Sequence, residues 1–78
     1  MNVVVDDRLQ EVMMGMLNPK MSVSYVEVNG DCLDEVVSEV YARCVDKRAD
    51  LYIGCDEVVS ELRKLGMKCV LVEGDVDA

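Results

Sequence analysis

Short apolar runs alternate along this chain of 78 residues with segments whose apolar residues recur at helical spacing. Runs rich in Val, Leu and Ile favour strands, and spacings of three and four residues favour amphipathic helices. The four predicted strands are Asn2–Val5, Met21–Asn29, Leu51–Ile53 and Lys68–Glu73. Because strands that alternate with helices pair in parallel, the sequence predicts a single α/β domain, residues 1–78, with the order βαβαβαβ.

The segment Gly30–Arg48 carries the clearest helical pattern. Its apolar positions form one stripe, which we expect to face the sheet: Leu33, Val36, Val37, Val40, Tyr41, Cys44 and Val45. Asp31 is the expected N-cap, and Lys47 and Arg48 place positive charge where the helix dipole favours it. This segment is therefore predicted to be the main helix of the core.

One shorter helix is predicted on each side of it. The first is capped by Asp6 or Asp7, and its stripe is Leu9, Val12, Met13, Met16 and Leu17 before Asn18-Pro19 ends it. The other is capped by Cys55 or Asp56, and its stripe is Val58, Val59, Leu62 and Leu65 before Gly66. The sequence DEVVSE starts both this helix and the main one, at 34–39 and 56–61. Duplication of one βα unit would explain this repeat, and so would similar structural requirements at the two helix starts; the two explanations are equally good.

Polarity sets the expected strand order. The first and third strands are apolar, which suits the buried middle of a parallel sheet, whereas Ser22, Ser24 and Glu27 indicate that the second strand lies at an edge. We therefore expect the order 2-1-3-4 in a small three-layer domain, with the first helix on one face and the other two on the opposite face.

Composition narrows the classes of function. Sixteen acidic against eight basic residues give a net charge of −8, which disfavours nucleic acid and anionic membrane surfaces as partners. No apolar run reaches the roughly 20 residues of a membrane span and no signal-peptide pattern opens the chain, so a cytoplasmic location is expected. His, Thr, Phe and Trp are absent and 31% of residues are charged, a composition that hints at a thermophilic source.

Candidate ligand-binding residues gather where the predicted strands end, because ligands of open parallel sheets bind there, near the point where strand order reverses. The residues expected at this edge are Asp6, Asp7, Gly30, Asp31, Cys32, Gly54, Cys55 and Asp56. Asp6, Asp7 and Asp56 suit Mg²⁺, which takes one or two carboxylates, although a helix N-cap requires the same residue type. Helix N-termini favour a thiolate at Cys32 and Cys55, but their acidic neighbours oppose it, so inert small side chains are the favoured interpretation.

Two segments resemble a known family. VVVDDR at 3–8 and ADLYIGCDEVVSELRKLGMKCVLV at 49–72 are similar to the first and last elements of PIN-like nuclease domains. In that family an aspartate after the first strand and another after a late strand bind the metal, so the resemblance implies metal binding by Asp6 and Asp56. The chain departs from the family in its shorter length and missing central helical region, and its net charge opposes an RNA substrate.

No Ser/His/Asp set, P-loop or dinucleotide-binding motif occurs in the chain. We therefore expect a non-enzymatic protein-binding or regulatory module with no required cofactor. The alternative is a Mg²⁺-dependent phosphoryl-transfer or PIN-like nuclease site on the aspartates. The last strand offers a further surface, because Val70, Leu71 and Val72 are apolar and yet lie at a sheet edge in the predicted order. This edge is expected to bind a protein partner or a second copy of the chain.

Overall fold

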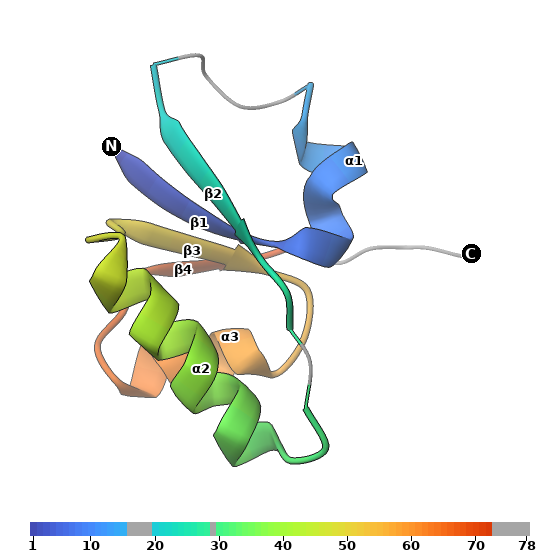
Figure 1. Ribbon diagram of the computed structural model, residues 1–78, viewed down its shortest axis with the longest axis vertical. Coiled ribbons are helices and arrows are strands. Elements are labelled where there is room, and N and C mark those ends of the chain that lie inside the picture. Colours follow the sequence, from blue (N-terminus) through green and yellow to red (C-terminus); the bar gives the residue numbers. More distant parts are fainter. Residues whose placement is uncertain (16–19, 29, 73–78) are drawn as a thin grey trace.

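The computed structural model describes residues 1–15, 20–28 and 30–72. Its strands are β1 (Asn2–Asp6), β2 (Ser22–Val26), β3 (Leu51–Gly54) and β4 (Cys69–Leu71). They form one parallel sheet in the order β2-β1-β3-β4 (Figure 1), so the predicted fold class and strand order are confirmed. β1 lies between β2 and β3, where its valines are shielded from water on both faces.

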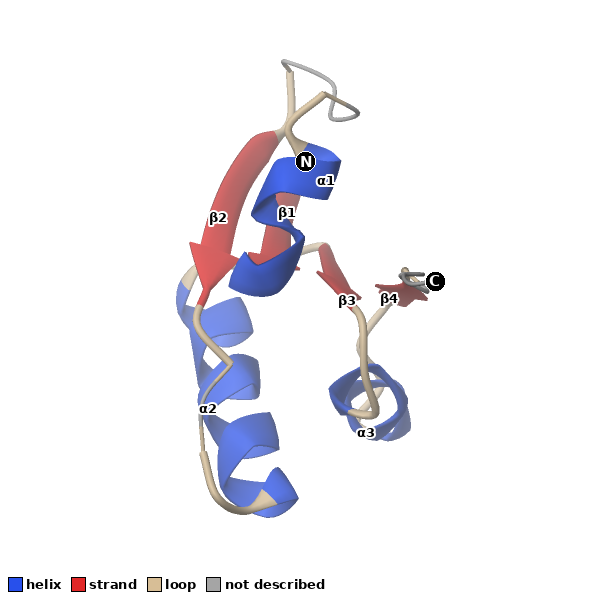
Figure 2. Cartoon of the chain, turned by 90° about the vertical axis from the view of Figure 1, so that its right-hand side faces the viewer, coloured by secondary structure: helices blue, strands red, loops and turns tan. Residues whose placement is uncertain are grey.

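Helices cover the two faces of the sheet unequally. The 3₁₀ turn η1 (Asp7–Leu9) continues into α1 (Gln10–Met13) on one face, whereas α2 (Leu33–Asp46) and α3 (Val58–Lys64) lie on the other (Figure 2). Side chains of a strand alternate between faces, so Val4 packs with α2 and α3 while Val3 and Val5 pack with α1. This division of the helices between the faces is the predicted one.

Helix α2 packs through a narrower stripe than the sequence predicts. Its buried residues are Val36, Val37, Val40 and Cys44, whereas Tyr41 is 38% and Val45 60% exposed. A helix lying on a sheet buries the residues along its line of contact, and these two lie beside that line. The expected N-cap is also wrong: the N-cap residue is Cys32, one position after Asp31, and its side chain caps no backbone group.

Helix α3 ends as predicted, at a glycine with a left-handed backbone. Gly66 has a φ of 91°, and the backbone N–H of Met67 donates to Leu62 O at 3.1 Å while that of Gly66 donates to Arg63 O at 3.0 Å. This pair of hydrogen bonds is the Schellman motif. Leu65, predicted in the buried stripe, follows the last helical residue and is exposed.

Helix α2 ends in the same motif without a glycine. The backbone N–H of Ala49 donates to Cys44 O at 2.8 Å, and that of Arg48 donates to Val45 O at 3.1 Å. Arg48 takes the left-handed position with a φ of 53°, which costs an L-residue energy that glycine avoids.

The first helical segment is shorter and less regular than predicted. Leu9 and Met13 are buried as expected, but Val12 is exposed. The 3₁₀ turn winds with three residues per turn instead of 3.6, which shifts the phase of the residues that follow it. Met16 and Leu17, with the predicted stop at Asn18-Pro19, lie outside the described residues.

Candidate functional site

The carboxyl ends of β1 and β3 meet at the point where the strand order reverses, and Arg8 joins the carboxylates there. Arg8 Nη2 lies 2.5 Å from Asp6 Oδ2 and 2.6 Å from Asp56 Oδ2, and its Nε donates to both Asp6 oxygens at 3.1 Å. Asp6 is fully buried and also accepts the backbone N–H of Arg8, so it caps η1 as predicted. The guanidinium thus links the end of β1 to the start of α3.

Arg8 supplies the positive charge that a metal ion would bring to these carboxylates. Hydrogen bonds that the guanidinium donates to Asp6 and then to Asp56 raise the pKa of Arg8 above its ordinary value, so the group stays charged. Asp7, the third predicted ligand, is exposed in η1 and forms no ion pair with Arg8. Among residues 1–15, 20–28 and 30–72, no three Asp, Glu or Cys side chains are placed to hold a metal ion together. Binding of Mg²⁺ at Asp6, Asp7 and Asp56 stays a prediction.

Asp56 is the capping residue expected for α3. Its Oδ1 accepts the backbone N–H of Val58, the first residue of the helix, at 3.1 Å, although the N-cap position itself is Glu57, one residue later than predicted. In the repeated DEVVSE segment, the paired valines are buried in both helices (Val36 and Val37, Val58 and Val59), so the repeat packs equivalently on the sheet.

Three of the predicted edge residues, Gly30, Asp31 and Cys32, line a small hollow beside this cluster, whereas Gly54 and Cys55 do not. The hollow has a volume of about 270 Å³, and these three residues form one side of it. This volume is below the roughly 300–1,000 Å³ of typical small-molecule sites. A Cβ on Gly30 would lie 2.6 Å from Val36 Cγ2, so the glycine is explained by close packing against α2.

Gly54 has a packing role as well. A Cβ at this position would lie 2.6 Å from Tyr52 Cε2 and 2.9 Å from Val59 Cγ2, so the close approach of β3 to α3 requires glycine. Tyr52 is fully buried, and its hydroxyl has no hydrogen-bond partner within the described part of the chain. Burial, followed by the charges of Asp6 and Asp56, raises the pKa of Tyr52 above its ordinary value.

Cys55 is half-buried next to the same carboxylates. Its Sγ donates to Asp6 Oδ2 at 3.7 Å, and burial, followed by the charge of Asp6, raises the pKa of the thiol. A raised pKa keeps the thiol protonated and therefore a poor nucleophile. Cys32 is exposed and unpaired, and Cys44 is buried in the core.

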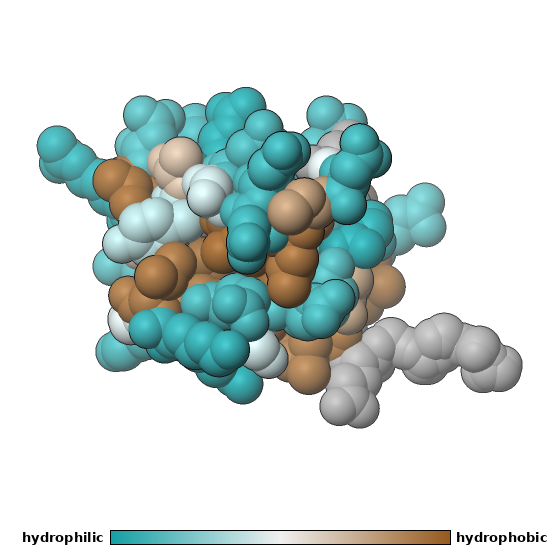
Figure 3. Space-filling model, turned by 90° about the horizontal axis from the view of Figure 1, so that it is seen from below, coloured by the Kyte–Doolittle hydropathy of each residue, from teal (hydrophilic) through white to brown (hydrophobic). Residues whose placement is uncertain are grey.

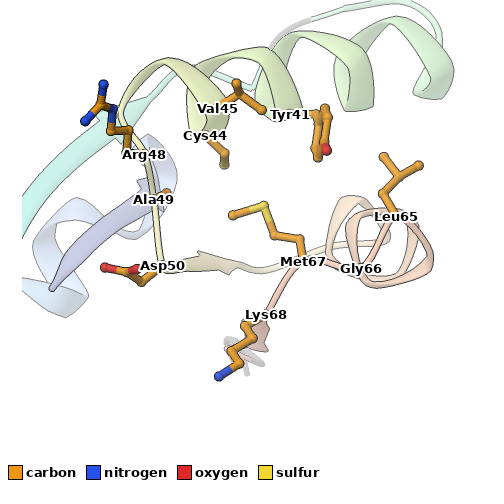
Figure 4. Close-up of a pocket in the computed structure, with 10 residues that line it drawn as sticks. All are labelled: Tyr41, Cys44, Val45, Arg48, Ala49, Asp50, Leu65, Gly66, Met67 and Lys68. Carbon is orange, nitrogen blue, oxygen red and sulfur yellow. The ribbon is translucent and has the colours of Figure 1, made fainter.

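A larger pocket, which the sequence does not reveal, lies at the opposite end of the molecule, between the C-terminal ends of α2 and α3, and both apolar and polar side chains line it. It measures about 440 Å³. In Figure 4, Met67 points from the loop after α3 toward Cys44 of α2, and Tyr41 faces Leu65 across the opening. Tyr41 and Leu65 are both exposed. Figure 3, which views the molecule from the side of α2 and α3, shows apolar side chains exposed between two hydrophilic bands.

Basic residues are concentrated near the C-terminal ends of α2 and α3 in a chain that is acidic overall. Six of the eight basic residues lie at the ends of α2 and α3 or just before β4: Arg43, Lys47, Arg48, Arg63, Lys64 and Lys68. Arg48 and Lys68 belong to the pocket wall, and their charged ends point outward into solvent (Figure 4). Neither side chain makes an ion pair or hydrogen bond with any residue that the structure describes. The acidic residue of the wall, Asp50, accepts the backbone N–H of Asn2 at 2.9 Å.

Sequence reasoning missed two further residues at the carboxyl edge, Arg8 and Tyr52. Arg8 follows Asp6 by two positions, and this spacing lets both the backbone N–H and the guanidinium of one arginine donate to the same carboxylate, which is a signal that could have been used. Tyr52 follows a strand pattern that gives no indication of its unpaired hydroxyl.

Comparisons of the chain with protein families, with curated proteins and with solved structures find no match. No helix in the described ranges is long and apolar enough to span a membrane.

Proposed function

We propose that this domain is a non-enzymatic protein-binding module that captures an acidic peptide segment in the pocket between α2 and α3. The observation that supports this most directly is a pocket of about 440 Å³ whose wall combines apolar side chains with two basic ones, Arg48 and Lys68, that pair with no residue in the described ranges. A protein interface typically has an apolar centre and a polar rim, and this end of the molecule has both.

The apolar centre requires an apolar anchor from the partner. Tyr41, Leu65 and Met67 present carbon and sulfur surface around the opening, and two of these side chains are exposed. An aliphatic or aromatic side chain that enters removes this surface from water, which is worth about 25 cal/mol for each Å² buried. The side chain of Met67 is flexible and polarisable, so the pocket adapts to anchors of different shape.

The rim requires acidic residues beside that anchor. Arg48 and Lys68 stand on opposite sides of the opening, so carboxylates before and after the anchor reach them. The net charge of −8 repels an acidic peptide at long range, but at physiological salt this repulsion decays over about 8 Å. The local basic residues therefore dominate once the peptide is in contact. Four free thiols suit a reducing compartment, which is consistent with a cytoplasmic location.

The test uses a synthetic peptide in which one leucine is flanked by aspartate and glutamate, titrated into the ¹⁵N-labelled protein. We expect the amide signals of Tyr41, Leu65 and Met67 to shift together. Two matched peptides are the ligand controls, one with alanine in place of the leucine and one with lysine in place of the acids. Each should bind at least about tenfold more weakly. Absence of localised shifts with the acidic leucine peptide would contradict the proposal.

Variants of the protein separate local charge from total charge. The double variant Arg48→Glu/Lys68→Glu should abolish binding of the peptide. The control Lys47→Glu/Lys64→Glu makes the same change in total charge at two lysines outside the pocket wall and should retain most of the affinity. Equal losses in both variants would mean that only total charge matters.

A magnesium-dependent enzyme is the alternative, and it would need Arg8 to leave Asp6 and Asp56. A titration with Mg²⁺ followed by backbone NMR distinguishes the two functions. Localised shifts at Asp6 and Asp56 in the millimolar range would favour the metal site over the peptide-binding module.

A further inference from the structure

Strand β4 is an edge strand of the sheet, and no other strand of the described chain pairs with its outer side. The backbone N–H of Tyr52 donates to Lys68 O at 3.0 Å and that of Val72 donates to Gly54 O at 2.8 Å, so the peptide groups of residues 68 and 72 face β3. Peptide groups alternate in direction along a strand. Cys69 and Leu71 therefore direct their N–H and C=O groups away from the sheet, where no strand of the described chain pairs with them.

The side chains of β4 do not protect this edge. Val70 is 43% and Leu71 41% exposed, and the strand has no charged residue within Cys69–Leu71. Proteins normally block such an edge with charge, proline or a covering element, because it pairs readily with another strand. The opposite edge, β2, differs in carrying Ser22 and Ser24.

One side chain does cover part of the edge. Arg63 Nη2 donates to Cys69 O at 3.1 Å from helix α3. The hydrogen bond satisfies one outward carbonyl, whereas the N–H of Cys69 and both backbone groups of Leu71 have no hydrogen-bond partner among the described residues. Arg63 therefore competes with any strand that adds to β4.

We propose that β4 pairs with β4 of a second copy of this chain, antiparallel, about a twofold axis through Val70. In this register Cys69 of each copy lies opposite Leu71 of the other, and both residues have outward backbone groups. Each such pair exchanges two N–H···O bonds, as antiparallel hydrogen-bonded pairs do. The two sheets then become one continuous sheet with no open edge at β4.

The side chains around this axis fit a second copy. Val70 pairs in register with Ile53, so it lies on the face that α1 covers only in part (Figure 2). Across the axis Val70 meets Val70, a β-branched apolar pair that stabilises a sheet. Lys68 precedes β4 in the sequence. Antiparallel pairing places the two Lys68 residues of a dimer at opposite ends of the paired strands, whereas parallel pairing would bring these like charges together.

Proline at position 71 is the sharpest test, because the N–H that it removes points outward and is not used in pairing with β3. Sedimentation equilibrium from about 1 µM to about 100 µM should show a dimer for the wild type. Leu71→Pro should be a folded monomer with the wild-type far-UV circular dichroism spectrum. Val70→Lys is a second variant, in case proline prevents folding, and should also be a monomer.

Arg63→Ala tests the competition at Cys69. Freeing this carbonyl should strengthen dimerisation by about tenfold, since a hydrogen bond from a charged donor no longer has to be broken in each copy. A wild type that stays monomeric throughout the concentration range would overturn the proposal. So would a dimer that persists in both Leu71→Pro and Val70→Lys, since it would use another surface.

Discussion

On the face of the sheet under α2 and α3, ten of the described residues are buried in one cluster, whereas on the face under η1 and α1 five are buried. The first face has two helices of 14 and 7 residues, and the second has a single turn of 3₁₀ helix and 4 residues of α-helix. The free energy of folding should therefore come mainly from the α2–α3 face. The thinner face leaves apolar strand surface near β4 accessible for association.

Val37→Asp should have the largest effect, because it places a charge against the sheet under α2, where Val37 is buried. The loss should be several kcal/mol, enough to unfold a domain of this size. Circular dichroism during thermal unfolding measures it. Glu39→Gln, on the exposed side of the same helix, should change stability by less than about 0.5 kcal/mol. A folded, stable Val37→Asp protein would show that the packing of α2 is misassigned.

Truncation of one leucine on each face sharpens the comparison. Leu62→Ala removes a fully buried side chain under α3 and should cost about 3 kcal/mol. Leu9→Ala, on the thinner face, should cost about 2 kcal/mol because the neighbouring short helix can move to fill the space. Urea unfolding of both variants gives the two values. Equal losses, or a larger one for Leu9→Ala, would contradict the difference between the faces.

Alkaline pH should also act on the α2–α3 face, which contains Cys44 and Tyr52. Burial raises the pKa of the Cys44 thiol from 9.0 to about 11. Since the unfolded chain releases this proton at lower pH than the folded protein, the free energy of unfolding falls as the pH rises through this range. From about pH 8 to about pH 10.5 the contribution of Cys44 should fall by about 1–2 kcal/mol. Urea unfolding at these two pH values measures this loss, and the difference between the two midpoints should be smaller for Cys44→Ala than for the wild type. An equal difference in both proteins would assign the pH dependence to other groups.

Arg48→Gly should have the smallest effect and the opposite sign. Glycine adopts the left-handed backbone at the end of α2 without strain, so the variant should gain about 0.5–1 kcal/mol. The reverse change at the end of α3, Gly66→Arg, should lose a similar amount, and thermal unfolding measures both. A loss of stability in Arg48→Gly would mean that contacts of the arginine side chain outweigh the backbone strain.

The order of strands was predictable because it depends on polarity along whole elements. Three consecutive valines in β1 require burial on both faces, and the serines of β2 tolerate water. Periodicity along a helix predicts which side is apolar but not how wide a stripe its neighbours cover. Tyr41 and Val45 were therefore predicted in the core and are exposed.

The candidate sites were harder to predict because they depend on residues that come together from distant parts of the chain. The predicted topology was enough to identify the aspartates at the strand ends. The ion pairs of Arg8 with Asp6 and Asp56 were not predictable, because residue spacing does not indicate a contact between residues 8 and 56. The pocket wall combines the end of α2 with the loop after α3, so it too is visible only once the helices are placed.

The central position of β1 affects how the chain folds during synthesis. β1 precedes the other strands in the sequence, and its Val3 pairs with Leu51 of β3. β1 therefore completes its pairing only after most of the domain has been translated. Contacts between residues far apart in sequence slow folding, and an exposed run of valines is prone to aggregate. In nascent chains that end before β3, one edge of this apolar strand is therefore unpaired. We expect the sheet to become stable against aggregation only once residues 51–54 have been synthesised.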